Sequence, residues 1–470
     1  MASLSFEEGA HLLRRAGFGG TPQEIDDLAS RGREGAVDFL INYNQIDNSA
    51  LENLLSASFN LTGDGITNGE IRRWWFTRMV NTRRQFEEKL TLFWHNHFAT
   101  SSSKVQDTFM FNQNVLLRQL ALDRFDNLLL KVSQDPAMLI WLDSITNILG
   151  KANENFAREL QELFTMGIND VVTGEQNYTE QDVKEVARAF TGWNYRRQTP
   201  FPFQLNATQH DNGFKSIYAG TPWAQTGNLS GEDVITIICG RPATARYLTW
   251  KLFNFFVYPI TNSATDKATI DRFAKVYLNN NHSIKELVRA IFTSDEFFSE
   301  RAFFSLVKQP TEYIVGSIRM LGGTYNQGTN QRGSNTLSTS SRNMGQDLFA
   351  PPDVAGWDFN LGWVSTATML ERFNFANTYL TNRNTTNPGV FVTTDQLKSI
   401  TKASSKKTVK RFLSRLGPLN AGDSIGILRS YLETGDNGQP VTFVNDDATV
   451  DKKVRGLVHQ IMCLPEYQLN

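Results

Sequence analysis

One stretch decides the fold class: Phe93-Trp94-His95-Asn96-His97-Phe98-Ala99-Thr100-Ser101. It closes a helical pattern that begins at Ile71, in which apolar side chains recur at helical spacing and arginines and glutamates form the opposite face. The same period returns over most of the chain, and strand patterns are few and short. The sequence therefore predicts a mainly α protein, one large multi-helix domain with long ordered loops and a smaller helical C-terminal part.

Helix starts and polar linkers predict how the chain is divided. Thr21 and Glu24 form a capping-box pattern with Pro22 at the first helical position, and Thr179 is the expected N-cap of another helix. A polar linker begins at residue 381. We expect a helical domain over residues 1–380 and a smaller helical subdomain over 381–470, which could also be continuous with the first.

Two segments break the helical pattern, and a short helix is expected after the second. Residues 194–227 are rich in Pro, Gly, Thr and Asn and predict a long ordered loop with room for a short hairpin. Residues 322–341 are rich in Gly, Asn, Ser and Thr and are expected to be mobile. Residues 343–349 predict one short helix.

Composition limits the classes of function. A formal net charge of -1 gives no basic field for nucleic acid. The two cysteines have no partner at metal-ligand spacing and predict reduced thiols. No apolar run is long enough to span a membrane, and no signal peptide is visible at the start. As written, the sequence predicts a cytoplasmic protein without a transmembrane segment.

Two of the six histidines, His95 and His97, stand one residue apart among aromatic side chains. On a regular helix such neighbours point about 200° apart, so they could not share one metal ion. If the helix frays before the polar run that follows, one unwound turn could present both. The alternative is structural, with a histidine packed and hydrogen-bonded beneath its aromatic neighbours.

A second polar cluster lies inside a helical pattern at 153–167. Asn155, Glu159 and Glu162 share one stripe, and two carboxylates at this spacing suit metal binding or proton transfer, with a glutamate as general base. The alternative is a solvated face, in which Arg158 pairs with Glu154 and with Glu162.

The long loop contributes His210 and Asp211, which could be metal ligands or a ligand with its orienting partner. The run that follows them, through Gly213, is equally a turn signature. Arg188, Trp193 and Trp357 suit the lining of a binding pocket, although tryptophans at helical spacing also serve in cores.

With these motifs in view, the chain resembles a bacterial family described only as a domain of unknown function, number 1800. The matching stretches cover most of the chain: 11–19, 93–101, 135–139, 153–167, 178–180, 190–193, 210–211, 307–310, 345–349 and 351–357. The resemblance implies that relatives are often exported with a twin-arginine leader, which is not visible in the sequence as written. It also implies a neighbouring gene for a protein similar to sulfatases and phosphatases, as a candidate partner.

Two hypotheses for function follow. In the first, the chain is a metal-dependent enzyme, hydrolytic or oxidative, in which His95, His97, His210 and Asp211 hold a divalent metal ion and Glu159 and Glu162 are catalytic. In the second, it is a non-catalytic scaffold or binding protein for a protein or glycan. Asn155, Arg188, Trp193 and Trp357 are the predicted binding residues, and Trp223 and Trp363 would extend the aromatic surface.

Overall fold

Helices dominate the structure and confirm the mainly α fold. The computed structural model describes residues 3–61, 65–328, 333–417 and 420–470. Within those ranges the strands form only short antiparallel pairs, β1 with β2, β3 with β4 and β5 with β6.

The first third of the chain is built of helices that begin at the predicted caps. Thr21 accepts from the Glu24 amide and Glu24 accepts from the Thr21 amide, as the capping box predicts. The elements are α1 (Phe6–Arg15), α2 (Pro22–Ala29), α3 (Gly32–Ile41), η1 (Tyr43–Gln45), α4 (Ser49–Ser58), α5 (Asn68–Asn81), α6 (Gln85–His97), α7 (Asp107–Gln119), α8 (Phe125–Ser133), α9 (Pro136–Trp141) and η3 (Ser144–Thr146).

The middle third contains the predicted long loop, which holds two short hairpins. Thr179 caps the helix that precedes this loop, as expected. The elements are α10 (Asn155–Glu159), η4 (Leu160–Thr165), α11 (Glu180–Ala189), β1 (Trp193–Tyr195), β2 (Phe203–Leu205), η5 (Ala207–Gln209), β3 (Lys215–Ile217), β4 (Gln225–Gly227), α12 (Gly231–Cys239), α13 (Pro242–Phe256), α14 (Ala264–Asn279) and α15 (Ile284–Phe292).

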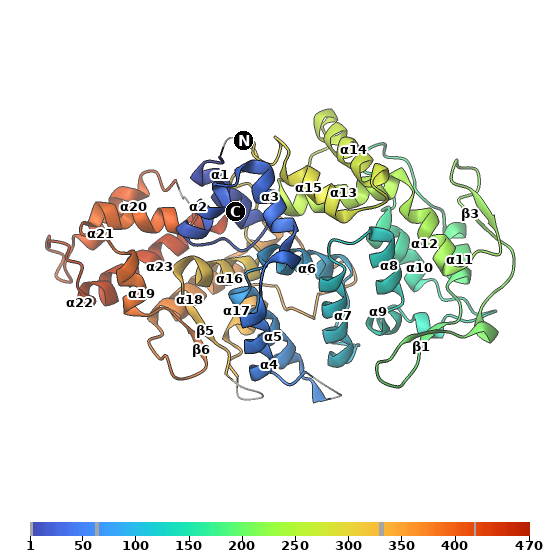
Figure 1. The fold of residues 1–470 in the computed structure, drawn as a ribbon, viewed down its shortest axis with the longest axis horizontal. Coiled ribbons are helices and arrows are strands. Elements are labelled where there is room, and N and C mark those ends of the chain that lie inside the picture. Colours follow the sequence, from blue (N-terminus) through green and yellow to red (C-terminus); the bar gives the residue numbers. More distant parts are fainter. Residues whose placement is uncertain (1–2, 62–64, 329–332, 418–419) are drawn as a thin grey trace.

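The last third is again helical. Its elements are α16 (Pro310–Leu321), β5 (Thr324–Asn326), α17 (Thr336–Asn343), η7 (Asn360–Trp363), α18 (Thr366–Thr381), β6 (Gly389–Phe391), α19 (Thr394–Ile400), α20 (Ser405–Arg415), α21 (Ser424–Leu432), α22 (Asp447–Thr449), η8 (Val450–Val454), α23 (Arg455–Cys463) and η9 (Pro465–Gln468). Figure 1 shows an elongated molecule with α19 to α22 at one end and α11, α12 and β3 at the other.

One local prediction was wrong in its boundaries, whereas the mobility expected of residues 322–341 stays a prediction. Residues 343–349 do not form the expected helix, because α17 lies earlier and ends at Asn343. In the stretch expected to be mobile, Thr324–Asn326 pairs with β6, and residues 329–332 lie outside the described part.

The long pattern from Ile71 forms two helices instead of one. The backbone turns at Thr82 between α5 and α6. Arg319, on α16, donates to the carbonyls of Met79, Val80 and Thr82, so the end of α5 is satisfied by a side chain from far along the chain.

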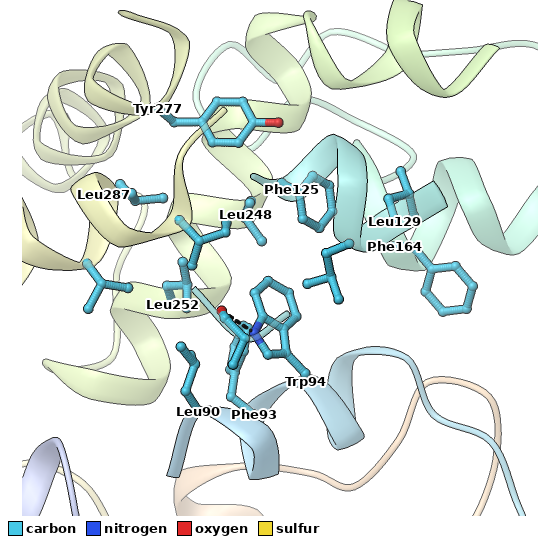
Figure 2. Close-up of a cluster of buried hydrophobic side chains, with 14 of the residues drawn as sticks. Leu90, Phe93, Trp94, Phe125, Leu129, Phe164, Leu248, Leu252, Tyr277 and Leu287 are labelled. Carbon is cyan, nitrogen blue, oxygen red and sulfur yellow. Dashed lines mark hydrogen bonds between the residues drawn. The ribbon is translucent and has the colours of Figure 1, made fainter. Parts of the chain in front are cut away.

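Helix α6 lies at the centre of the packing. Phe93 and Trp94 belong to a hydrophobic cluster that gathers α1 to α3, α8 and α12 to α15. Figure 2 shows Trp94 among Phe125, Leu248 and Leu252, with its indole N–H donating to the Ala121 carbonyl at 2.9 Å. Because α6 is buried along almost its whole length, the residues at its end are held rigidly.

A second hydrophobic cluster joins the two ends of the sequence. It contains Ile71 and Trp75 of α5 together with Ile314 of α16, Phe375 of α18 and Val458 of α23. Residues beyond 380 therefore pack into a core that residues before 110 also build. The division at residue 380 stays a prediction.

No helix in the described ranges is both long enough and apolar enough to cross a membrane.

Candidate functional site

His95 and His97 both lie within regular helix at the end of α6, so the unwound turn is not formed. His95 Nε2 accepts the Phe349 backbone N–H at 3.0 Å. His97 Nε2 donates to the Phe164 carbonyl at 3.0 Å. The two rings thus face different segments, as the helical geometry predicts.

Burial keeps both imidazoles neutral. It lowers the pKa of His95 to about 3, and for His97 burial and then the charge of Lys251 lower the pKa to about 3. Because a carbonyl can only accept, the proton of His97 is on Nε2, which leaves the buried Nδ1 with a lone pair and no hydrogen-bond partner.

The predicted carboxylate pair sits where the α-helix widens into a π-helix. Glu159 ends α10, and Glu162 lies within η4, which is a π-helix. Both side chains are half-buried, and Glu162 accepts from the Tyr178 hydroxyl at 3.2 Å. Burial, followed by the charge of Glu162, raises the pKa of Glu159. π-Turns of this kind occur frequently at functional sites.

Arg158 forms only one of the two ion pairs predicted for a solvated face. Its guanidinium binds Glu154 at 3.3 Å and Glu180 at 2.7 Å, and no ion pair with Glu162 is formed among the described residues. Asn155 is exposed, and its side-chain amide donates to Asp143 at 3.4 Å.

The segment at His210 folds the loop back onto α11. Arg188 Nε donates to Asp211 Oδ2 at 2.8 Å, while Asp211 Oδ1 accepts the Gly213 amide at 2.8 Å, which is the predicted turn. His210 Nδ1 donates to the Thr191 carbonyl at 2.8 Å. These contacts occupy the Asp211 carboxylate, so its position supports the structural alternative.

The tryptophans proposed for a binding surface differ in exposure. Trp193 is buried between Phe190 and Phe203, and Trp363 is buried as well. Trp223 is exposed. Trp357 is 5% exposed but lines a cavity next to α6.

This cavity, the Trp357 pocket, has a volume of about 270 Å³. Its aromatic walls are Phe93, Trp250, Phe255, Trp357 and Phe359, and its polar lining is Asn96, His97, Lys251, Asn254, Asp353 and Asp358. Asn96 holds one wall, because its Oδ1 accepts the Trp357 N–H at 2.7 Å and its Nδ2 donates to the Trp357 carbonyl at 3.2 Å. The pocket brings His97 and Trp357 together, but none of the other predicted site residues lines it.

Lys251 is the residue that the sequence analysis missed. It lies on α13 between Trp250 and Leu252, and burial lowers its pKa to about 8. It pairs with no carboxylate in the described ranges, and its Nζ lies 5.6 Å from the centre of the Tyr247 ring. A single lysine inside an apolar helical run was the signal that could have identified it.

A larger cavity of about 430 Å³ opens between α4, α5, α6 and α7. Two of its lining residues, Arg78 and Arg118, bind the fully buried Glu88, each at 2.9 Å. The neighbouring Glu87 lines the cavity, and burial together with the charge of Glu88 raises its pKa to about 7. Its Oε2 is buried without a hydrogen-bond partner.

The predicted metal ligands do not gather in one place. In the part of the chain that the structure describes, no three residues among His, Cys, Asp and Glu lie close enough together to hold a metal ion. The metal-binding role of His95, His97, His210 and Asp211 stays a prediction.

Comparison with known proteins gives the family. A family model described as protein of unknown function, DUF1800, matches residues 11–469, so the chain belongs to that family. No curated protein and no solved structure matches the chain. The resemblance seen in the sequence motifs is thereby confirmed over nearly the whole length.

Proposed function

We propose that this member of the DUF1800 family binds a small polar organic ligand, of the size of a single sugar ring, in the Trp357 pocket. The observation that carries the proposal is the composition of this pocket, in which aromatic walls surround Lys251 and Asp358, and neither of these charged side chains forms an ion pair among the described residues. Ligand sites of soluble proteins combine apolar walls with a few well-placed polar groups in this way. The proposal develops the glycan-binding alternative predicted from the sequence.

The free polar groups are few and specific. Asn96 and Asn254 are occupied, since Asn254 donates to the Trp250 carbonyl and accepts the Ile260 amide, each at 2.8 Å. Lys251 and the Asp358 carboxylate are left to contact a ligand, because the Nδ1 of His97 is buried out of reach of the pocket. One is a donor and the other an acceptor, which favours a ligand that carries both an acceptor oxygen and a hydroxyl.

A titration with named sugars tests the proposal. Glucose, galactose, N-acetylglucosamine and glucuronate are added to the protein, and tryptophan fluorescence is followed because Trp250 and Trp357 line the pocket. We expect saturable quenching by at least one sugar, and its loss in Ala355→Trp, which places a large side chain at the edge of the pocket. Ala152→Trp, at an exposed site outside the pocket, is the matched control.

Two results would overturn this proposal. One is the absence of a saturable response to every sugar. The other is equal binding by the wild type and Ala355→Trp, which would place the ligand elsewhere.

As a second candidate we propose the enzyme predicted from the sequence, confined to proton transfer by Glu159 and Glu162. The support is the raised pKa of Glu159, since a carboxyl that holds its proton to higher pH than an exposed glutamate is better suited to acid–base work. The described residues offer no group of ligands that fits the predicted divalent ion, so the proposal assigns no step to a metal. Hydrolase and oxidase substrate screens on the wild type beside Glu159→Gln test it. An activity that survives this change unaltered would exclude Glu159.

A further inference from the structure

We propose that Lys251 is a nucleophilic amine that forms an imine with a small hydroxy-aldehyde or hydroxy-ketone bound in the Trp357 pocket. The inference rests on the proposed ligand-binding function and names the chemical class of the ligand. The open-chain form of a reducing sugar belongs to this class.

The position of Lys251 sets it apart from the other buried lysines. Lys89 is paired with Glu312 and donates to the Gly17 carbonyl at 2.9 Å, and Lys308 donates to the Tyr467 carbonyl at 2.5 Å. Lys251 lines a cavity instead. Asp353 and Asp358 line the same cavity, but among the described residues neither forms an ion pair with the Lys251 ammonium. Burial without an ion-pair partner favours the neutral form of a lysine side chain.

The charge state supports nucleophilic attack at physiological pH. Burial lowers the pKa of Lys251 to about 8, so about a tenth of the amine is neutral at pH 7. An exposed lysine, with a pKa of about 10.4, is neutral in only about four molecules in ten thousand at that pH. A desolvated lysine in an apolar pocket is one of the ways in which proteins activate an amine.

The reaction balances without a further reactant. The lone pair of the neutral Lys251 Nζ attacks the carbonyl carbon, a C–N bond forms, and the carbonyl oxygen takes up a proton. The oxygen then leaves as water with both protons of the amine, and a C=N bond remains. Nothing is oxidised or reduced.

Asp358 favours carbonyl compounds that also carry a hydroxyl. Its side chain lines the same pocket, and among the described residues its carboxylate forms no ion pair. A hydroxyl group next to the carbonyl would donate to this carboxylate, whereas a plain aldehyde has no hydroxyl to donate.

Reductive trapping tests the inference on the intact protein. Glyceraldehyde is added at low concentration at pH 7, borohydride reduces any imine to a stable amine, and peptide mass spectrometry locates the adduct. We expect Lys251 to be modified at least tenfold faster than the exposed Lys184 and Lys406, with a rate that rises with pH to a midpoint near 8. Propanal, which has the same three carbons without hydroxyls, should react more slowly at Lys251.

The controls separate this inference from the binding proposal. Lys251→Arg should lose the pocket adduct while the exposed lysines react as before. Modification of Lys251 no faster than that of Lys184 would refute the inference even if sugars bind and Ala355→Trp abolishes their binding, in which case the binding proposal stands alone. Equal rates with propanal and glyceraldehyde would refute the role given to Asp358.

Discussion

Replacing Glu87 by glutamine should make the folded protein more stable at alkaline pH. The pKa of this carboxyl rises from 4.5 to about 7 on folding, because burial and the neighbouring Glu88 disfavour its charge more than Arg118, Arg78 and Arg84 favour it. The folded protein therefore binds more protons than the unfolded chain between these two pKa values. Stability falls as the pH rises through that window.

The magnitude follows from the size of the shift. One pKa unit corresponds to about 1.4 kcal/mol, so the charged carboxylate costs about 3 kcal/mol of unfolding free energy at pH 8. At pH 5 the cost is below about 1 kcal/mol, because the folded carboxyl is still protonated. Glutamine is neutral at every pH. The difference in unfolding free energy between Glu87→Gln and the wild type should therefore grow by about 2 kcal/mol, in favour of the variant, from pH 5 to pH 8.

Urea unfolding at pH 5 and pH 8, followed by circular dichroism, measures this difference. Glu175→Gln is the matched control, since Glu175 is an exposed glutamate and its exchange should change little at either pH. If the difference in unfolding free energy between Glu87→Gln and the wild type is the same at both pH values, the pKa of Glu87 is not raised by folding. The reasoning would then fail.

Three further predictions concern stability and the pocket. Glu88→Gln should destabilise the protein by about 3–5 kcal/mol in chemical unfolding, because it leaves the buried guanidiniums of Arg78 and Arg118 without their shared anion; a loss below about 1 kcal/mol would contradict this. Gly356→Ala should abolish ligand quenching of tryptophan fluorescence. Gly356 has a φ of 87°, and a Cβ there would collide with Asn96, which positions Trp357. Unaltered quenching would show that the loop adapts to the added methyl group. Thr21→Ala removes an N-cap and should cost about 1 kcal/mol, and an unchanged melting temperature would mean that tertiary contacts alone hold α2.

Local signals in the sequence were sufficient for the starts of several helices. Thr21 and Thr179 marked helix starts because the stabilising hydrogen bonds lie within three residues. The directions of His95 and His97 stayed open between a regular helix and an unwound turn, and the structure shows that the helix continues through His97. The break at Thr82 was not visible, because the group that satisfies the end of α5 is Arg319, more than two hundred residues away.

The pocket could be predicted only in part, because it is assembled from distant segments. Trp357 and His97 were singled out for their chemistry, but nothing local shows that Asn96 ties the Trp357 backbone to α6. Lys251 is conspicuous only once α13 is known to be buried around it. The π-helix at Leu160–Thr165 carries no sequence signature, so the position of Glu162 relative to Glu159 was predicted for a regular helix.

The second hydrophobic cluster has a consequence for synthesis on the ribosome. Ile71, Trp75 and Phe109 emerge early, but their partners Tyr313 and Ile314 follow only after roughly 200 further residues. At about 5–20 residues per second, translation takes roughly 10–40 seconds to supply them. For that time the nascent chain carries an apolar surface that it cannot yet cover, and this segment is where a chaperone would be expected to bind.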